Sequence, residues 1–194
     1  GDNIHAHAAI LSNSNISHAN LTHAYLHRVD FRYADLSHSI LNRADMRGAV
    51  FYRAKLSNVI ANNSLLIAAN LREADLNHAD LRDSHLNDAN LFKADLSYSN
   101  MESKYDDSFT IINKANLEGA NLSHAKMRNI FAVTSNLHKS NLSYAHLQHA
   151  ILTGSLVSAA NVEGADFENV ELGSVTMKFS NFSTGSANNV ISCC

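Results

Sequence analysis

The stretch Ala69-Asn70-Leu71-Arg72-Glu73-Ala74-Asp75-Leu76 decides the fold, because its order of small residue, Asn or Asp, and large apolar residue recurs after five positions. Steps of five outward from Leu71 reach a large apolar residue almost everywhere between Leu11 and Met101, with Ala61 as the exception. A five-residue period fits neither the 3.6-residue α-helix nor the two-residue alternation of a simple strand. The chain is therefore a repeat array in which every repeat contains a turn.

Each repeat is expected to combine a short extended piece with a corner. The small residue and the large residue two places later point to the same side, because side chains alternate across a strand. We expect both to face the core, and the Asn or Asp between them to face outward, where these side chains stack in rows. Four glycines lie two places after a large residue, at the third position of a β-turn, where positive φ is required: Gly48, Gly119, Gly154 and Gly164.

The repeat changes phase once along the chain. Met101 and Ile112 are eleven residues apart where two repeats would span ten, and the second register then runs on to Phe182. We interpret this phase slip as a single inserted residue within 102–111, which predicts a bulge and not a long loop.

The pattern [Ala/Ser/Val]-[Asn/Asp]-[Leu/Phe]-x-x resembles the pentapeptide-repeat protein family, and the resemblance covers about residues 9–184. It implies an all-β fold, a right-handed quadrilateral parallel β-helix, or solenoid, in which four pentapeptides form each coil. On that basis the chain makes roughly nine coils at a strand spacing of about 4.8 Å. Residues 1–8 are expected to form an N-terminal cap, with Asp2 starting a short helix, and residues 185–194 a C-terminal tail.

The composition excludes several classes of protein. The 194-residue chain has a formal net charge of −3, so it lacks the basic field that drives non-specific binding to phosphate backbones, and direct nucleic-acid binding is not expected. No apolar run approaches the ~20 residues that cross a bilayer, so we expect no membrane association. The only cysteines are the adjacent Cys193 and Cys194, which favours a cytoplasmic protein, although a removed signal sequence stays open.

A filled solenoid core predicts that the protein is not an enzyme. Enzymes need a concave site in which polar groups converge, and no G-x-S-x-G, Walker A, H-E-x-x-H or C-x-x-C motif occurs in the chain. We therefore expect no catalytic residues and no cofactor. His18 and His38 should lie one coil apart, but two exposed imidazoles without a carboxylate are usually surface residues and seldom a zinc site, so no metal is expected.

One corner of the predicted coil carries a cationic and aromatic stripe, formed by outward residues about one coil apart: Arg32, Tyr33, Tyr52, Arg53, Arg72, Phe92 and Lys93. Such a stripe could bind an acidic partner protein, because Arg and aromatic residues are enriched in interface hot spots. The alternative is that the stacked pairs only stabilise neighbouring coils.

Two outward apolar residues adjoin unusual inward alanines. Ile60 precedes Ala61, and Phe131 precedes Ala132. Either the large residues mark small apolar contact patches, or the backbone rolls locally so that they fill the space that alanine leaves. The second reading needs no partner and is slightly preferred.

The C-terminal end suggests self-association. An open solenoid end exposes apolar core and needs a cover, so we expect an end-to-end homodimer through Val175, Met177, Phe179 and Phe182. The sequence thus predicts a non-catalytic structural or protein-interaction rod. The resemblance adds one alternative, a DNA-mimicking binder of DNA gyrase that confers quinolone resistance. A third class of function is an interaction module of a secreted effector, for which the sequence carries no signature.

Overall fold

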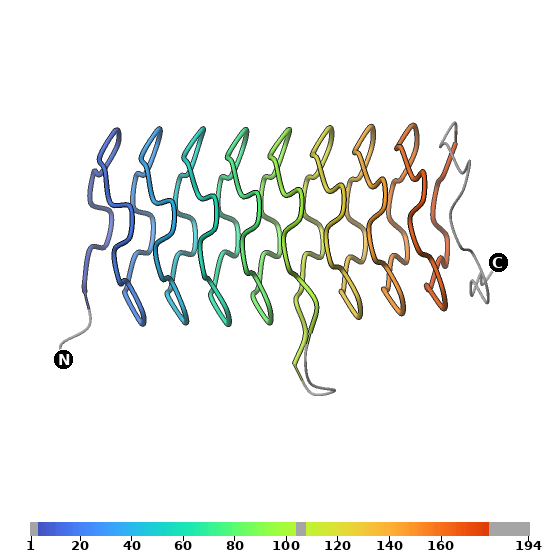
Figure 1. Ribbon diagram of the computed structural model, residues 1–194, viewed down its shortest axis with the longest axis horizontal. Coiled ribbons are helices and arrows are strands. Elements are labelled where there is room, and N and C mark those ends of the chain that lie inside the picture. Colours follow the sequence, from blue (N-terminus) through green and yellow to red (C-terminus); the bar gives the residue numbers. More distant parts are fainter. Residues whose placement is uncertain (1–3, 104–107, 179–194) are drawn as a thin grey trace.

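The computed structural model describes residues 4–103 and 108–178, which form an elongated stack of similar coils (Figure 1). Within these residues the backbone forms neither helices nor strands of several residues, and the coils are joined by single-residue parallel bridges. The first coil forms four of them, His5 with Tyr25, Ile10 with Asp30, Asn15 with Asp35 and Asn20 with Ile40. Four bridges per coil give the rod four sides, each with one row of outward side chains.

A β-turn separates successive sides. Its fourth residue donates a backbone N–H to the carbonyl of the first, as from Ala24 to Leu21 and from Ala34 to Phe31, both at 3.0 Å. Its third residue has positive φ, as expected for Gly48 at 66°. The same conformation holds bulky residues such as Tyr33, with φ of 59°, so corner side chains project outward whatever their size.

The inward positions form one continuous core, as predicted from the repeat. Ala24, Leu26 and Phe31 are almost fully buried, and the rings of Phe31 and Phe51 stack with centroids 5.0 Å apart. Each buried Leu or Phe side chain contributes roughly 1.5–3 kcal/mol before conformational entropy is subtracted. The column of large residues is therefore the main stabilising term of the rod.

The outward Asn or Asp has a local structural role. Its Oδ1 accepts the N–H of the residue two places later, as from Ser37 to Asp35 at 3.0 Å and from Ser97 to Asp95 at 2.9 Å. Amides in this row also bond from coil to coil, with Asn141 Nδ2 donating to Asn121 Oδ1 at 3.1 Å. The recurring Asn or Asp therefore satisfies a turn N–H that the coil-to-coil ladder leaves free.

The interruption of the repeat is larger than the expected bulge. Bridge partners are 20 residues apart up to Asp80 and Asn100, but His85 pairs with Ile111, 26 residues later. The coil therefore holds six extra residues, and the described chain on either side of residues 104–107 extends away from the rod (Figure 1). The single-residue interpretation was wrong because an insertion of six residues shifts a five-residue pattern by the same one position.

The described residues at the base of this segment are bonded to each other and to the rod. Ser103 Oγ accepts the N–H of Thr110 at 2.9 Å, and the Ser108 hydroxyl donates to Asp83 at 3.0 Å. The ring of Phe109 packs edge-on against that of Phe131, with centroids 4.6 Å apart. These contacts fix where the segment leaves its corner.

The N-terminal end differs from the prediction, and the C-terminal end is described only in part. Residues 4–8 belong to the first coil, since Ala6 donates its N–H to the Tyr25 carbonyl at 2.9 Å, so the short helix expected within residues 1–8 does not occur in its described part. At the other end Val175 and Met177 pack against the core while remaining partly exposed. Phe179, Phe182 and the tail 185–194 lie outside the described residues.

The backbone does not roll at the two inward alanines. Ala61 donates to the Asp80 carbonyl and Ala132 to the Ile151 carbonyl, both at the ordinary distance of 2.8 Å. Ile60 stays outside with 39% of its surface exposed. A small apolar cavity lies beside Ala61 instead, so the preferred reading, in which Ile60 fills that space, is wrong.

Candidate interaction surfaces

The corner stripe that the sequence predicted is a continuous chain of contacts. The Tyr33 and Tyr52 rings meet edge to face with centroids 5.5 Å apart, and Arg53 Cζ lies 5.2 Å from the Tyr52 centroid. One coil further, Arg72 Cζ and Lys93 Nζ lie 4.7 Å and 5.3 Å from the centroid of Phe92. The structure thus brings the predicted residues together on one edge of the rod.

Carboxylates neutralise part of this stripe. Arg32 Nη2 lies 2.7 Å from Asp30, whereas Arg53 and Arg72 share Glu73 at 2.6 Å and 3.2 Å. The hydrogen bond from Arg32 lowers the pKa of Asp30, and that from Arg53 lowers the pKa of Glu73. Both carboxylates are therefore anionic near neutral pH, and sequence reasoning did not assign them to the stripe as counter-charges.

A second corner carries a stack of aromatic rings, which we call the ring ladder: His18, His38, Asn58, His78, Tyr98, His124 and Tyr144. His18 and His38 stack at 5.0 Å, and beyond Asn58 the stack resumes from His78 to Tyr98 at 5.0 Å, to His124 at 4.7 Å and to Tyr144 at 5.1 Å. The interplanar angles are 4°, 11°, 3° and 9°. The rings therefore form one nearly parallel column with a gap at Asn58.

The sequence showed only the first part of this ladder. His124 and Tyr144 join the column only when the spacing between coils changes from 20 to 26 residues at the insertion. The Ser-His and Ser-Tyr pairs at 123–124 and 143–144 repeat the pairs at 37–38 and 97–98, and this signal could have found them.

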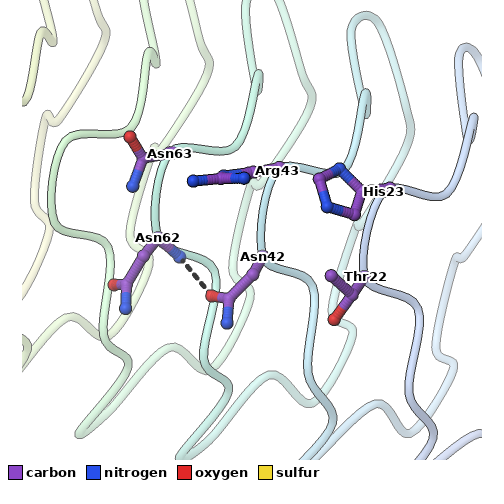
Figure 2. A pocket seen from close by; sticks show the side chains of 6 residues that line it. All are labelled: Thr22, His23, Asn42, Arg43, Asn62 and Asn63. Atoms are coloured by element: carbon purple, nitrogen blue, oxygen red, sulfur yellow. Dashed lines mark hydrogen bonds between the residues drawn. The ribbon is translucent and has the colours of Figure 1, made fainter.

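A third corner holds an open polar groove near the N-terminal end, lined by Thr22, His23, Asn42, Arg43, Asn62 and Asn63 (Figure 2). Asn42 Oδ1 accepts the Asn62 N–H at 3.0 Å, because Ile60 cannot supply the usual side-chain acceptor. Asn113 replaces that acceptor in the same way for Val133, at 2.8 Å. The amide of Asn42 thus serves the turn of the next coil, whereas Asn62 Oδ1 is buried without a hydrogen-bond partner.

The described residues contain no group of three or more His, Cys, Asp and Glu side chains that could hold a metal ion. His18 and His38 stack face to face, so their nitrogens do not converge on one point. In the described part of the chain no helix is long and apolar enough to cross a membrane.

These features define a four-sided solenoid whose side chains are either core, turn support or surface rows. The family model for pentapeptide repeats matches eight copies, over residues 9–48, 30–66, 49–88, 69–103 and 115–154. The chain therefore belongs to the pentapeptide-repeat family, and its fold is a right-handed β-helix. No curated protein sequence gives a significant match.

Solved structures of the same family align along most of the chain. HetL, involved in heterocyst differentiation regulation in the cyanobacterium Nostoc sp. strain PCC 7120, is 24% identical over 97% of this chain and 86% of its own, with a TM-score of 0.34. Full-length QnrB1, a plasmid-mediated fluoroquinolone resistance protein, is 18% identical over 97% and 93%, with a TM-score of 0.41. Rfr23 from the cyanobacterium Cyanothece 51142 is 20% identical over 69% and 87%, with a TM-score of 0.31.

Proposed function

We propose that the protein is a non-catalytic interaction rod of roughly nine coils that binds an acidic partner protein along the corner stripe. The observation that carries the proposal is the unbroken contact path from Tyr33 through Tyr52 and Arg53 to Arg72, Phe92 and Lys93. Such a path presents Arg and aromatic side chains, the residue types that dominate binding energy at interfaces.

The stripe is also held in place before any partner arrives. Arg53 and Arg72 are fixed by Glu73 and by the neighbouring rings, so little side-chain freedom is lost on binding. Four cations, Arg32, Arg53, Arg72 and Lys93, face the two carboxylates of Asp30 and Glu73, which leaves a local charge of 4 − 2 = +2. This sign favours a partner with an acidic surface.

Affinity capture from the native host with the wild-type rod and with a stripe variant tests the proposal. In the variant Tyr52→Ser and Lys93→Glu are combined, because both side chains are outward and neither is part of the core. A protein that binds wild type but not this variant supports the stripe, provided that Arg43→Glu on another corner still binds it. If every captured protein binds all three baits equally, the stripe is not the binding surface.

A DNA-mimicking binder of DNA gyrase is the second candidate function. The six-residue insertion in the coil before Ile111 favours it, since family members that bind gyrase tend to have loops inserted between coils. The cationic stripe opposes it, because mimicry of duplex DNA needs a long anionic face. A supercoiling assay separates the two: inhibition or quinolone protection of gyrase at micromolar concentration would replace the first proposal by this one.

The end-to-end homodimer and the cytoplasmic location also belong to this proposal. The partly exposed Val175 and Met177 support a contact at the C-terminal end. Light scattering of Met177→Asp tests it, since an end-to-end dimer should become monomeric, whereas Tyr33→Asn should leave it intact.

A further inference from the structure

The ridge that carries the ring ladder is free of charged side chains over most of the rod. Each ring follows a Ser or Asn in the turn, and these first-turn residues are Ser17, Ser37, Ser57, Asn77, Ser97, Ser123 and Ser143. No Asp, Glu, Lys or Arg occurs in either row until Glu163. A surface of this kind can approach an identical surface without charge repulsion along its crest, in contrast to the corner stripe.

The ridge also has an uneven profile. Tyr98 lies between the shorter rings of His78 and His124, and 51% of its surface is exposed. Asn58 lies between His38 and His78 and is shorter than both, so it leaves a notch in the line of rings. Tyr98 forms a knob and Asn58 a notch, and each lies one coil away from His78, on opposite sides.

This spacing makes the central part of the ridge, from Asn58 to Tyr98, complementary to itself. A twofold rotation through His78 turns a second rod antiparallel and brings Tyr98 of each copy opposite Asn58 of the other. The coil spacing is the same in both rods, and the coils stack in a straight line, so the remaining rings stay in register (Figure 1). In an isologous contact of this type one knob and one notch are used twice.

Charges on one adjoining side agree with the same rotation. It brings Lys55, whose side chain is 67% exposed, opposite Asp95 of the second copy, twice by symmetry. Asp75 meets its own symmetry mate between these pairs and opposes them. On the other adjoining side Asp80 also meets its own symmetry mate, and Lys55 already pairs with Asp35 at 3.5 Å. The charges therefore permit this register, and the rings select it.

We propose that two copies of this chain pair side by side and antiparallel through the ring ladder, with Tyr98 of each seated over Asn58 of the other. The rings are already stacked in the free rod, so few rotamers are lost on pairing. The ridge is about 29 Å long over six coil spacings, so the buried area falls below the ~1,200 Å² of standard interfaces. The pair is therefore weak, half-formed at a concentration on the order of 100 µM.

Sedimentation velocity of the full chain in reducing buffer, from about 5 to 500 µM, tests the proposal. The chain carries Met177→Asp throughout, which removes the proposed end-to-end contact. In this background it should shift from monomer to dimer across the range. Tyr98→Asn places notch opposite notch, and Asn58→Tyr places knob opposite knob, so each alone should weaken the dimer at least tenfold. Both substitutions suit the backbone, because Asn58 and Tyr98 have nearly equal φ values of 56° and 57°.

The combined variant Asn58→Tyr with Tyr98→Asn is the decisive one. It exchanges knob and notch about His78, so the two copies fit again and the dimer should return to wild-type strength. Asp75→Asn should strengthen pairing, and Tyr33→Asn on the corner stripe should not change it. In the Met177→Asp background, a monomer at every concentration, a dimer that both single variants retain, or a combined variant without rescue would each overturn the proposal.

Discussion

Filling the gap in the ring ladder by Asn58→Tyr should stabilise the protein. Asn58 lies between two stacked segments, His18 on His38 below and His78 on Tyr98 above, each with centroids 5.0 Å apart. Its φ of 56° equals that of Tyr144, a tyrosine in the same column, so the backbone need not change. A tyrosine here would face a ring on both sides and join the two segments into one stack.

The expected size of the effect follows from these contacts. Two new stacked pairs contribute about 0.5–1.5 kcal/mol each, and the lower value applies on an exposed ridge. Asn tolerates positive φ better than Tyr, and ordering the longer side chain has an entropic cost, which together subtract roughly 0.5 kcal/mol. The net gain is about 0.5 kcal/mol, or roughly 1–2 °C in the melting temperature of a chain of this length.

Circular dichroism melts at about 5 µM, where the proposed pairing is negligible, measure this change. Asn63→Tyr is the matched control, because Asn63 has the same type of turn with φ of 57° but Arg43 and Asp83 as its column neighbours. That control should be neutral or slightly destabilising. If both variants melt alike, or Asn58→Tyr melts below wild type, stacking does not stabilise the ridge and the argument is wrong.

Four further substitutions test the core and the turns. Leu76→Asp should abolish cooperative unfolding in a urea titration, because Leu76 is 1% exposed and a buried carboxylate has no partner there; a wild-type midpoint would contradict the inward assignment. Ser99→Ala should stabilise the protein by about 1 kcal/mol, because the Ser99 hydroxyl is buried without a hydrogen-bond partner. Ser64→Ala should destabilise it by a similar amount, because it removes the 2.7 Å hydrogen bond to the Ala61 carbonyl. Equal urea midpoints for the two variants would refute this. Asp35→Asn should lower stability at pH 7, because hydrogen bonds from Ser37 lower the folded-state pKa of Asp35. This stabilisation is present above the unfolded-state pKa and disappears as the pH falls through the folded-state pKa. A stability difference from wild type that persists at about pH 2 would contradict the prediction.

The sequence was sufficient for the core because burial in this fold depends on local order alone. Leu71 and Ala74 face inward through the alternation of their own repeat, and the same reasoning placed the corner residues Tyr52 and Arg53 on the surface. The stripe contacts followed from the coil length that the family resemblance supplied. The ion pairs of Asp30 and Glu73 could not be predicted in this way. Asp30 belongs to the row that supports the turns, and Glu73 reaches its arginines through flexible side chains.

The phase of the five-residue repeat does not give the length of the insertion before Ile111. This limited the prediction of the surface columns more than the prediction of the core. Inward residues need only the phase, so Ile112 and Leu117 were assigned correctly on the far side. Surface columns need the full length of each coil, so His124 and Tyr144 could not be joined to Tyr98 from phase.

The same distinction shows where functional information resides in this chain. The inward residues are needed for the stability of the core, and the outward Asn or Asp is needed to accept the turn N–H. The fold alone therefore explains both rows. The fold does not constrain the turn residues in this way. Exceptions in the Asn or Asp row are informative where another residue takes over the role, as when Asn42 supplies the hydrogen-bond acceptor that Ile60 lacks. Columns of turn residues whose side chains contact one another from coil to coil, such as the corner stripe and the ring ladder, are therefore where binding partners should be sought.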